Sequence, residues 1–348
     1  MVDKNSFRIV RVAKRMCSAS MDSYRRISIL VFIVFVLVSP SCRRSSSDQF
    51  KNDQGPLIVF NAGSLTAPVA DLLREFTKRR SQKAPQQESA GSLEAVRKIT
   101  ELGKPCDVLA VADYDVIPTL MIPQYADWYA VFARNQLVLM YAPNSKFSGD
   151  INKDNWFEIL KRPDLQYGYS NPDLDPAGYR TLLHWQLSET YYHRPGLYQQ
   201  LKAGVPLRNI RPKSVELVAL LQSGELDYIY GYRSVAEENN LKFITFPPEI
   251  DFSDASKASF YATATIEVAG KSPSEKIRIT GAPILYGLTI PRSAPHKELA
   301  EEFLEFMWSP DGQAILQRDH LMLISPPQVN SLEKLPGRLR DKVILFRP

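Results

Sequence analysis

The sequence predicts an α/β fold with two lobes. Short apolar runs of strand length alternate with apolar residues at helical spacing, so residues 57–60 indicate a strand and residues 65–76 the helix that follows. Farther on, the pattern indicates a second helix at 93–102 and a second strand at 107–111. The alternation is typical of α/β architectures. After the N-terminal segment about 300 residues remain, which is more than one ordinary domain holds.

The N-terminal segment has the features of an export signal. Two arginines at 25–26 precede an apolar run at 29–38, and small residues follow up to Cys42. The run is too short to span a bilayer as a helix. Cys42 resembles the acylated cysteine of a bacterial lipobox. We therefore predict a signal peptide at 1–42, lipidation of Cys42 and a flexible tether at 43–55, with ordinary signal cleavage nearby as the alternative.

Composition excludes several functional classes. The chain has 43 Lys and Arg against 38 Asp and Glu, a net charge of +5 that lies partly in the signal and tether. This mild excess gives no reason to expect a nucleic-acid partner. The three cysteines are Cys17, Cys42 and Cys106, and the four histidines are scattered. The sequence therefore predicts neither a disulfide framework nor a Cys/His metal cluster.

One tetrapeptide occurs twice, each time where a helix is about to begin. Ala-Gly-Ser-Leu stands at 62–65 and again at 90–93. Glycine lets the backbone approach a ligand closely, and a helix start offers free N–H groups beside the hydroxyl of Ser64 or Ser92. The pattern favours an anion site. The alternative is that both serines only cap their helices.

Two further helix starts in the second half each carry a carboxylate. The turn-rich loop 170–180 leads into a helix, with Asp175 predicted at the N-cap and Pro176 at the first helical position. Farther on, Glu216 stands in the first turn of a short helix, and a strand at 226–232 follows. Either carboxylate can be a ligand, or it can simply stabilise a helix start.

The chain shares a series of segments with one known family. They are, in order, residues 60–65, 90–92, 96–99, 107–110, 126–129, 133–136, 170–180 and 232–236. In these segments the chain resembles the tungstate/molybdate-binding proteins of the WtpA and archaeal ModA type, and the resemblance extends from Ile58 to about Pro327.

This resemblance implies a fold and a division into lobes. The fold is the two-lobed periplasmic-binding-protein fold of type II, with ligand in the cleft between the lobes. The chain would cross between lobes near 136–141 and return between 247 and 285. We therefore expect lobe 1 at 56–141 plus 271–348 and lobe 2 at 142–270.

The resemblance also implies a site and a partner. In lobe 1, the hydroxyl and N–H groups of Ser64 and Ser92 would bind oxygens of the oxyanion. In lobe 2, the amide of Ala177 or Gly178 and the Tyr232 hydroxyl would bind the others. Asp175 and Glu216 match carboxylates that approach the metal centre of the oxyanion and make it six-coordinate. Asn61 departs from the histidine common in the family. The expected protein is a monomer that faces the periplasm or cell exterior, is held to the membrane only by its lipid, has no cofactor and serves an ABC importer permease.

The two carboxylates need a physical reason, because an anion pocket should repel them. Molybdenum and tungsten in their highest oxidation state are large and Lewis acidic, so carboxylate oxygens can bond to them, whereas sulfur and phosphorus take no further ligand. Alternatively one carboxyl is protonated and favours a protonated oxyanion such as hydrogen phosphate. Helix starts and hydroxyls would supply the binding, with no arginine or lysine needed in the pocket.

Three other functions stay open from the residues. The first is a receptor for another oxyanion, sulfate or phosphate. The second is a receptor for a cation such as ferric iron, bound by Asp175, Glu216, Tyr232 and the nearby Tyr228 and Tyr230. That receptor would leave the paired tetrapeptides unexplained.

The third is an enzyme with Ser64 or Ser92 as nucleophile. The sequence has no histidine near either serine and no Gly-x-Ser-x-Gly elbow, so we expect no enzymatic activity.

Overall fold

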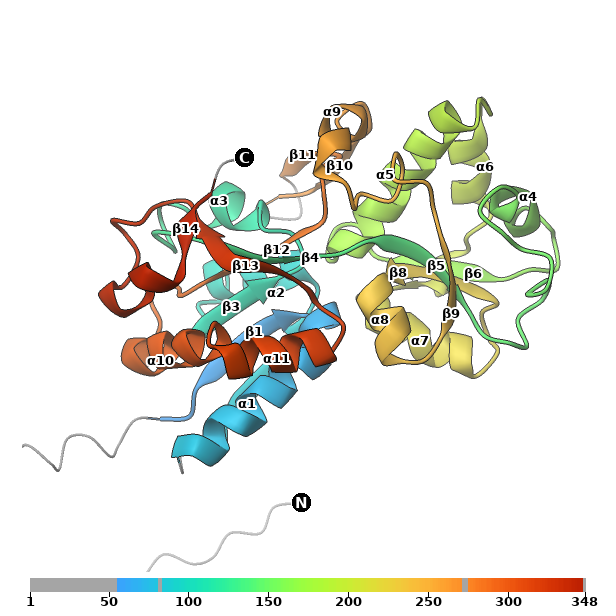
Figure 1. Ribbon diagram of the computed structural model, residues 1–348. Helices are drawn as coiled ribbons and strands as arrows, with labels where there is room; N and C mark the ends of the chain where they lie inside the picture. The colour runs from blue at the N-terminus through green and yellow to red at the C-terminus, as the bar shows by residue number, and fades with distance from the viewer. Residues whose placement is uncertain (1–54, 81–82, 271–274, 347–348) are drawn as a thin grey trace, which may run out of the picture. The chain divides into compact units, whose positions relative to one another are not determined.

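The computed structural model describes residues 55–80, 83–270 and 275–346 (Figure 1). The predicted signal peptide at 1–42, the lipidation of Cys42 and all but the last residue of the tether lie outside the described residues. In the part that is described, no helix combines the length and the apolar character that a membrane crossing needs.

The first sheet has seven strands in the order β14-β13-β4-β12-β3-β1-β2. β1 pairs in parallel with β2 and with β3, whereas β12 is antiparallel to β3 and β4. The strands are β1 (Ile58–Ala62), β2 (Gln86–Ala90), β3 (Val108–Val111), β4 (Ala130–Arg134), β12 (Leu285–Thr289), β13 (Met322–Val329) and β14 (Ile344–Leu345).

The register of β1 and β2 brings the two repeated tetrapeptides together. Ala62 at the end of β1 pairs with Ala90 at the end of β2. Each strand is followed at once by a helix start: the 3₁₀ turn η1 (Gly63–Leu65) leads into α1 (Thr66–Arg80), and α2 (Ser92–Thr100) follows β2. Carboxyl ends of parallel strands meet at one sheet edge, where ligands commonly bind in α/β folds. Ser64 and Ser92 therefore start neighbouring helical segments at the same edge.

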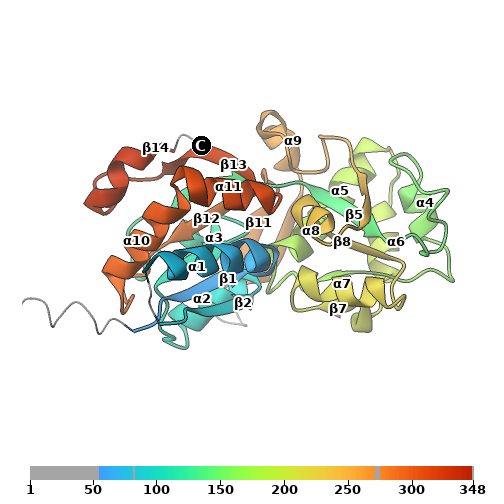
Figure 2. The same cartoon turned by 60° about the horizontal axis from the view of Figure 1, so that its bottom comes forward.

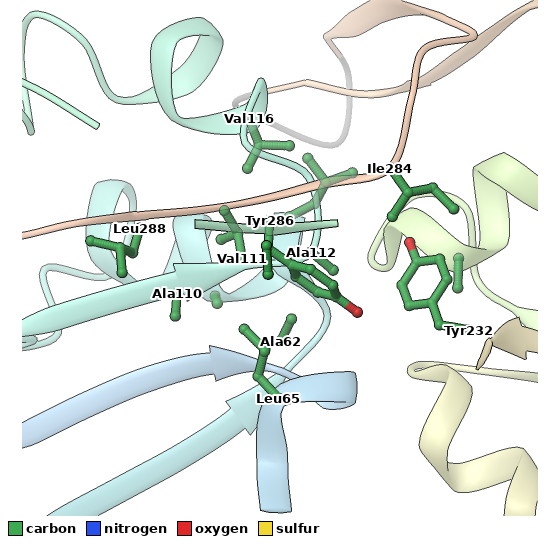
Figure 3. Close-up of a cluster of buried hydrophobic side chains, with 14 of the residues drawn as sticks. Ala62, Leu65, Ala110, Val111, Ala112, Val116, Tyr232, Ile284, Tyr286 and Leu288 are labelled. Carbon is green, nitrogen blue, oxygen red and sulfur yellow. The ribbon is translucent and has the colours of Figure 1, made fainter. Parts of the chain in front are cut away.

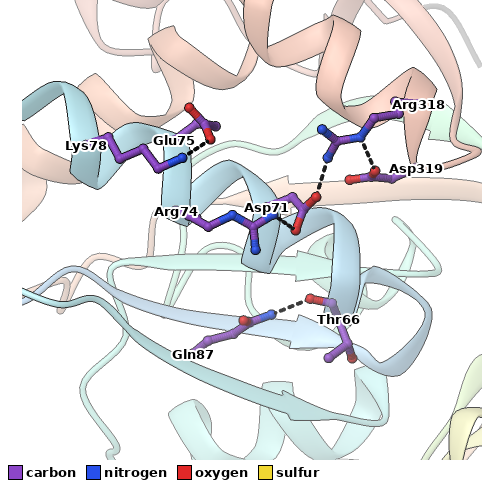
Figure 4. Close-up of polar contacts among 8 residues, drawn as sticks. All are labelled: Thr66, Asp71, Arg74, Glu75, Lys78, Gln87, Arg318 and Asp319. Carbon is purple, nitrogen blue, oxygen red and sulfur yellow. Dashed lines mark hydrogen bonds and ion pairs between the residues drawn. The ribbon is translucent and has the colours of Figure 1, made fainter.

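Further helices complete this half, and two of them pack on α1 (Figure 2). They are α3 (Val116–Leu120), α10 (Lys297–Met307), α11 (Pro310–Arg318) and the 3₁₀ segment η4 (Gly337–Lys342). Figure 4 shows the polar link between α1 and the end of α11, in which Arg318 bonds both Asp71 and Asp319. Helices from the C-terminal part of the chain thus pack on α1, the first helix after β1.

The second sheet has five strands in the order β7-β6-β8-β5-β9. Its strands are β5 (Leu137–Tyr141), β6 (Tyr167–Ser170), β7 (Ile210–Arg211), β8 (Tyr228–Tyr232) and β9 (Lys242–Thr245). The helices are α4 (Trp156–Leu160), α5 (Pro176–Tyr191), α6 (Leu197–Ala203), α7 (Ser214–Gln222) and α8 (Arg233–Glu238), with a 3₁₀ turn η2 (Leu207–Asn209).

The chain passes between the sheets twice. Asn135 and Gln136 join β4 of the first sheet to β5 of the second, and the return follows β9. The return includes η3 (Ala255–Lys257), α9 (Ala258–Tyr261) and the antiparallel hairpin of β10 (Thr265–Ala269) and β11 (Lys276–Thr280). The five residues of β5, which the predicted division assigns to lobe 1, pair within the second sheet. The lobe limits at 141 and 271 stay a prediction.

Phe303→Ala is expected to destabilise the protein. Phe303 of α10 is buried and meets Phe76 of α1 edge to face, with ring centroids 5.4 Å apart. Truncating a buried phenylalanine generally costs about 3–5 kcal/mol of unfolding free energy, which urea unfolding would measure. Leu207→Ala, at a side chain that is 86% exposed, is the control and should change stability little. Equal effects of the two substitutions would contradict this packing.

Candidate functional site

Ser64 and Ser92 are buried, and neither caps its helix. The N-cap residues are Ala62 and Gly91, without a side-chain capping bond in either case. Instead the Tyr286 hydroxyl donates to Ser64 Oγ at 2.9 Å, and the N–H of Ala112 donates to Ser92 Oγ at 3.0 Å. Simple capping therefore does not account for these two serines.

Asp175 joins two helix starts. It is the N-cap of α5, with Pro176 in the first turn, as predicted. Its Oδ1 accepts the N–H of Ala177 at 3.3 Å, and its Oδ2 accepts the N–H of Ser214, at the start of α7, at 2.7 Å. Both helix starts carry partial positive charge, so the place where they meet suits an anion, and here the protein's own carboxylate fills it.

Burial strongly affects the chemistry of Asp175. The side chain is almost completely enclosed, and this burial raises the pKa of its carboxyl, while the N–H groups of Ser214 and Ala177 counter part of the rise. Such N–H donors favour the ionised form of a carboxyl, and removal from water favours the protonated form. Burial and these N–H donors therefore shift the pKa of the Asp175 carboxyl in opposite directions.

The amides predicted for the oxyanion are already in use. The N–H of Ala177 bonds the Asp175 carboxylate, and the N–H of Gly178 bonds the Asp175 carbonyl at 3.0 Å. Gly178 also lies so close to the end of β6 that a Cβ would come within 2.1 Å of the Ser170 carbonyl oxygen. Glycine is thus required for α5 to begin against this strand.

Tyr232 ends β8 and is bonded by an arginine that sequence reasoning missed. Arg180 Nη1 donates to the Tyr232 hydroxyl at 2.6 Å and to the Ala112 carbonyl at 2.8 Å. Its Nη2 lies 3.3 Å from Asp113 Oδ2. Burial raises the pKa of the Tyr232 phenol well above its ordinary value, so the hydroxyl keeps its proton. In Figure 3 the Tyr232 ring lies beside that of Tyr286, with centroids 6.1 Å apart.

The sequence analysis expects that binding needs no arginine or lysine in the pocket, and the structure places Arg180 beside Tyr232. Arg180 is buried, and Asp113 at the end of β3 supplies a carboxylate as its counter-charge. A buried cation is stable only when it is paired, so the Arg180–Asp113 pair adds little net charge to the site. A signal existed in the sequence, because Arg180 closes the same 170–180 loop that contains Asp175.

Glu216 differs from the other predicted oxyanion and metal ligands because its side chain is partly exposed. It lies in the first turn of α7, yet its side chain is 38% exposed and its Oε1 is 3.8 Å from Lys213 Nζ. The same Lys213 Nζ donates to the Ser89 carbonyl, in β2 of the first sheet, at 3.1 Å. Of the predicted set, Ser64, Ser92, Asp175, Ala177, Gly178 and Tyr232 are buried and Glu216 is not.

The start of α2 contacts the loop that carries Asp175. The N–H of Leu93 donates to the Leu174 carbonyl at 3.1 Å, and that of Glu94 at 3.4 Å. Gly91 allows this approach, because a Cβ there would lie 2.1 Å from the same oxygen. The first sheet's helix start and the second sheet's loop are therefore in direct contact at the site.

Comparison with known proteins identifies the family. Residues 57–321 match the family of bacterial extracellular solute-binding proteins. The chain belongs to this family. A solute-binding protein of Petrotoga mobilis is 45% identical over 82% of this chain and 89% of its own length. The molybdate/tungstate-binding protein WtpA of Pyrococcus abyssi is 38% identical over 89% and 96%, respectively. WtpA of Thermococcus kodakarensis is 35% identical over 87% and 93%.

Solved structures confirm the fold of this solute-binding protein. The periplasmic molybdate-binding protein of Azotobacter vinelandii superposes with a TM-score of 0.56 at 19% identity, over 77% of this chain and 99% of that one. The sulfate-binding protein SubI of Mycobacterium tuberculosis gives 0.54 at 11% identity, over 84% and 94%. The predicted α/β periplasmic-binding fold of type II is thus confirmed, and the family agrees with an extracytoplasmic location.

The alternative ligand sets are not assembled in this solute-binding protein. The Tyr228 hydroxyl donates to the Lys146 carbonyl at 2.6 Å, away from Asp175, and the Tyr230 ring stacks on Phe246. Among the described residues no group of three His, Cys, Asp or Glu side chains could hold a metal ion. Within the same residues no histidine bonds Ser64 or Ser92, so neither serine has the partner of a nucleophile.

Gly91→Ala should loosen the contact between α2 and the 174 loop. The added Cβ cannot stay 2.1 Å from the Leu174 oxygen, so the bond from the Leu93 N–H should weaken. Losing about 1–2 kcal/mol would speed hydrogen exchange at Leu93 roughly five- to thirtyfold. Gly149→Ala is the control, since nothing lies within 4 Å of its Cβ position. Unchanged exchange at Leu93 in Gly91→Ala would refute the contact.

Proposed function

We propose that this solute-binding protein captures molybdate or tungstate outside the cytoplasmic membrane and delivers it to an ABC importer permease. The observation that carries the proposal is the buried Asp175 carboxylate at the shared start of α5 and α7, together with the buried hydroxyls of Ser64, Ser92 and Tyr232. WtpA relatives, named for molybdate and tungstate, support it, being 38% and 35% identical over most of the chain.

In this proposal hydrogen-bond donors bind the oxygens of the anion. Ser64 and Ser92 donate from the first lobe, and Tyr232 with the Ala177 or Gly178 amide donates from the second. The amides must exchange Asp175 for a ligand oxygen when the anion enters. Donors at helix starts are already oriented, so once Asp175 has moved they bind the anion without turning, and the cleft can close over the ligand. Closure is a hinge motion, and the permease recognises the closed form.

The carboxylates supply the selectivity. Asp175 leaves its amides and bonds the Lewis-acidic metal centre, and Glu216 turns from Lys213 into the cleft to bond it as well. Sulfate and phosphate cannot accept such bonds and are repelled by the carboxylates instead. If Asp175 instead stays protonated, consistent with the raised pKa of its carboxyl, it donates to a ligand oxygen and the site favours hydrogen phosphate.

The remaining parts of the chain serve this role in the cell envelope. Residues 1–42 direct export, Cys42 carries the lipid, and residues 43–55 tether the folded part to the membrane surface. The protein works as a monomer, has no catalytic activity and needs no cofactor. It contacts the small oxyanion and the permease, and it binds no nucleic acid.

Isothermal titration of the purified protein at neutral pH tests the proposal. Tungstate and molybdate are expected to bind tightly, with little or no heat from sulfate, phosphate or ferric citrate. Binding of sulfate or phosphate in their place would assign the site to another oxyanion. Binding of iron alone would indicate a cation receptor that uses Asp175 and the tyrosines. No heat of binding from any of the five ligands would reject the transport role.

Substitutions separate the carboxylates from the hydroxyls. Asp175→Ala and Glu216→Ala should weaken tungstate at least about tenfold, and more than sulfate, because they remove bonds to the metal centre. Ser64→Ala and Ser92→Ala should weaken every oxyanion, each by about tenfold, since a hydrogen bond to a charged group contributes about 1.5–3 kcal/mol. If the carboxylate variants bind tungstate as tightly as the wild type, the carboxylates do not bond the metal centre. Hydrogen bonds alone would then account for binding.

A further inference from the structure

Three hydroxyl groups at the site share one arrangement. The oxygens of Ser64, Ser92 and Tyr232 each receive a hydrogen bond, from the Tyr286 hydroxyl, the Ala112 N–H and Arg180 Nη1 in turn. Among the residues that the structure describes, none of the three donates its own hydrogen to a protein acceptor. The three hydrogens are therefore left for something else.

The direction of the bonds at Ser64 is set by Asn135, in the crossing between the sheets. Asn135 Oδ1 accepts the N–H of Gln136 at 2.9 Å, so its Nδ2 must face the other way. There Nδ2 donates to the Tyr286 hydroxyl at 2.9 Å and to Ser234 Oγ at 2.8 Å. An amide nitrogen can only donate. Tyr286 receives this bond, and its own hydroxyl donates to Ser64 Oγ at 2.9 Å.

The direction at Tyr232 is set by Arg180. A guanidinium has five N–H donors and no acceptor, so the Tyr232 oxygen can only accept from it. Arg180 is held in place by the Ala112 carbonyl and Asp113, both on the first sheet's side of the site. The N–H of the same Ala112 bonds Ser92. The three hydroxyls are therefore linked through shared neighbours into one oriented group.

We propose that Asn135, Tyr286 and Arg180 are positioning residues that fix Ser64 and Tyr232 as hydrogen-bond donors toward the bound anion. The inference rests on the proposed function and names the form of anion that the site takes. Hydroxyls held as donors suit a fully deprotonated oxyanion and offer nothing to an acidic hydrogen.

A double-mutant cycle in the purified protein tests the arrangement, with molybdate as the probe. Tyr286→Phe keeps the ring and removes the donor to Ser64 Oγ. We expect its Kd for molybdate to rise about tenfold, as for loss of one hydrogen bond to a charged group. In the Ser64→Ala background the same change should raise Kd less than about twofold, because Tyr286 acts through Ser64. A purely structural role would not produce this coupling.

A matched control and a reversal complete the experiment. Tyr167→Phe removes another buried hydroxyl, which bonds the Leu201 carbonyl at 2.7 Å in the second lobe, and should leave Kd unchanged. Asn135→Asp puts an acceptor where Nδ2 donates, so the Tyr286 hydroxyl should turn its hydrogen away from Ser64. The Kd for molybdate should then rise at least as much as in Tyr286→Phe. Thermal unfolding verifies that each variant is folded.

The outcomes are distinct. The inference is overturned if Tyr286→Phe binds molybdate like the wild type, or if it raises Kd by the same factor with Ser64 and with Ser64→Ala. The proposed function stands in either case. If Tyr286→Phe does not fold, Asn135→Asp decides, and unchanged binding there overturns the inference. A wild-type protein that binds no oxyanion removes the proposed function, and this inference with it.

Discussion

The site depends on one buried carboxylate. Asp175 accepts N–H groups from the starts of α5 and α7 and so holds two helices of the second sheet in a common orientation. An unpaired buried charge would be very unfavourable, and these donors, together with the helix dipoles, are what make its burial possible. The preceding residue, Leu174, receives N–H groups from α2. Helix starts from both sheets therefore converge on two consecutive residues.

This convergence lets the proposed anion site rely on backbone N–H groups rather than on an unpaired arginine. The positive potential comes from N–H groups at helix starts, which are fixed in direction and need no long flexible side chain. Arg180 is present but is paired with Asp113, and it bonds Tyr232 and the Ala112 carbonyl. Its main effect is on geometry, since it decides which way the tyrosine hydroxyl can point.

The family and the site geometry support different parts of the conclusion. Membership of the extracellular solute-binding proteins follows from the match over residues 57–321. It says nothing about which solute is taken. The solute is argued from Asp175 and the hydroxyls around it, together with the relatives named for molybdate and tungstate. Glu216, beside Lys213 at the rim, is the member of the set whose role needs a side-chain movement.

Local patterns predicted the elements well. The strand and helix that follow residue 57, the N-cap at Asp175 and the helix that begins at Ser214 were each predicted within a few residues. These features depend on periodicity and on capping, which act over a few neighbouring residues. The strand β2 was not predicted, because its residues 86–90 are mostly polar, so the register that pairs Ala62 with Ala90 comes from the structure.

What lay beyond the sequence was every long-range pairing. Tyr286 bonds Ser64 across 222 positions of the chain, and Arg180 reaches Ala112 across 68. No local period records such contacts. The first forms within the first sheet's half, between β12 and the turn after β1, and the second joins α5 of the second sheet's half to the end of β3. By itself the sequence determined where the helices start and which residues stand there. The tertiary structure decided which partners those residues meet, and hence which way each hydroxyl donates, because hydrogen-bond direction depends on the groups packed around it.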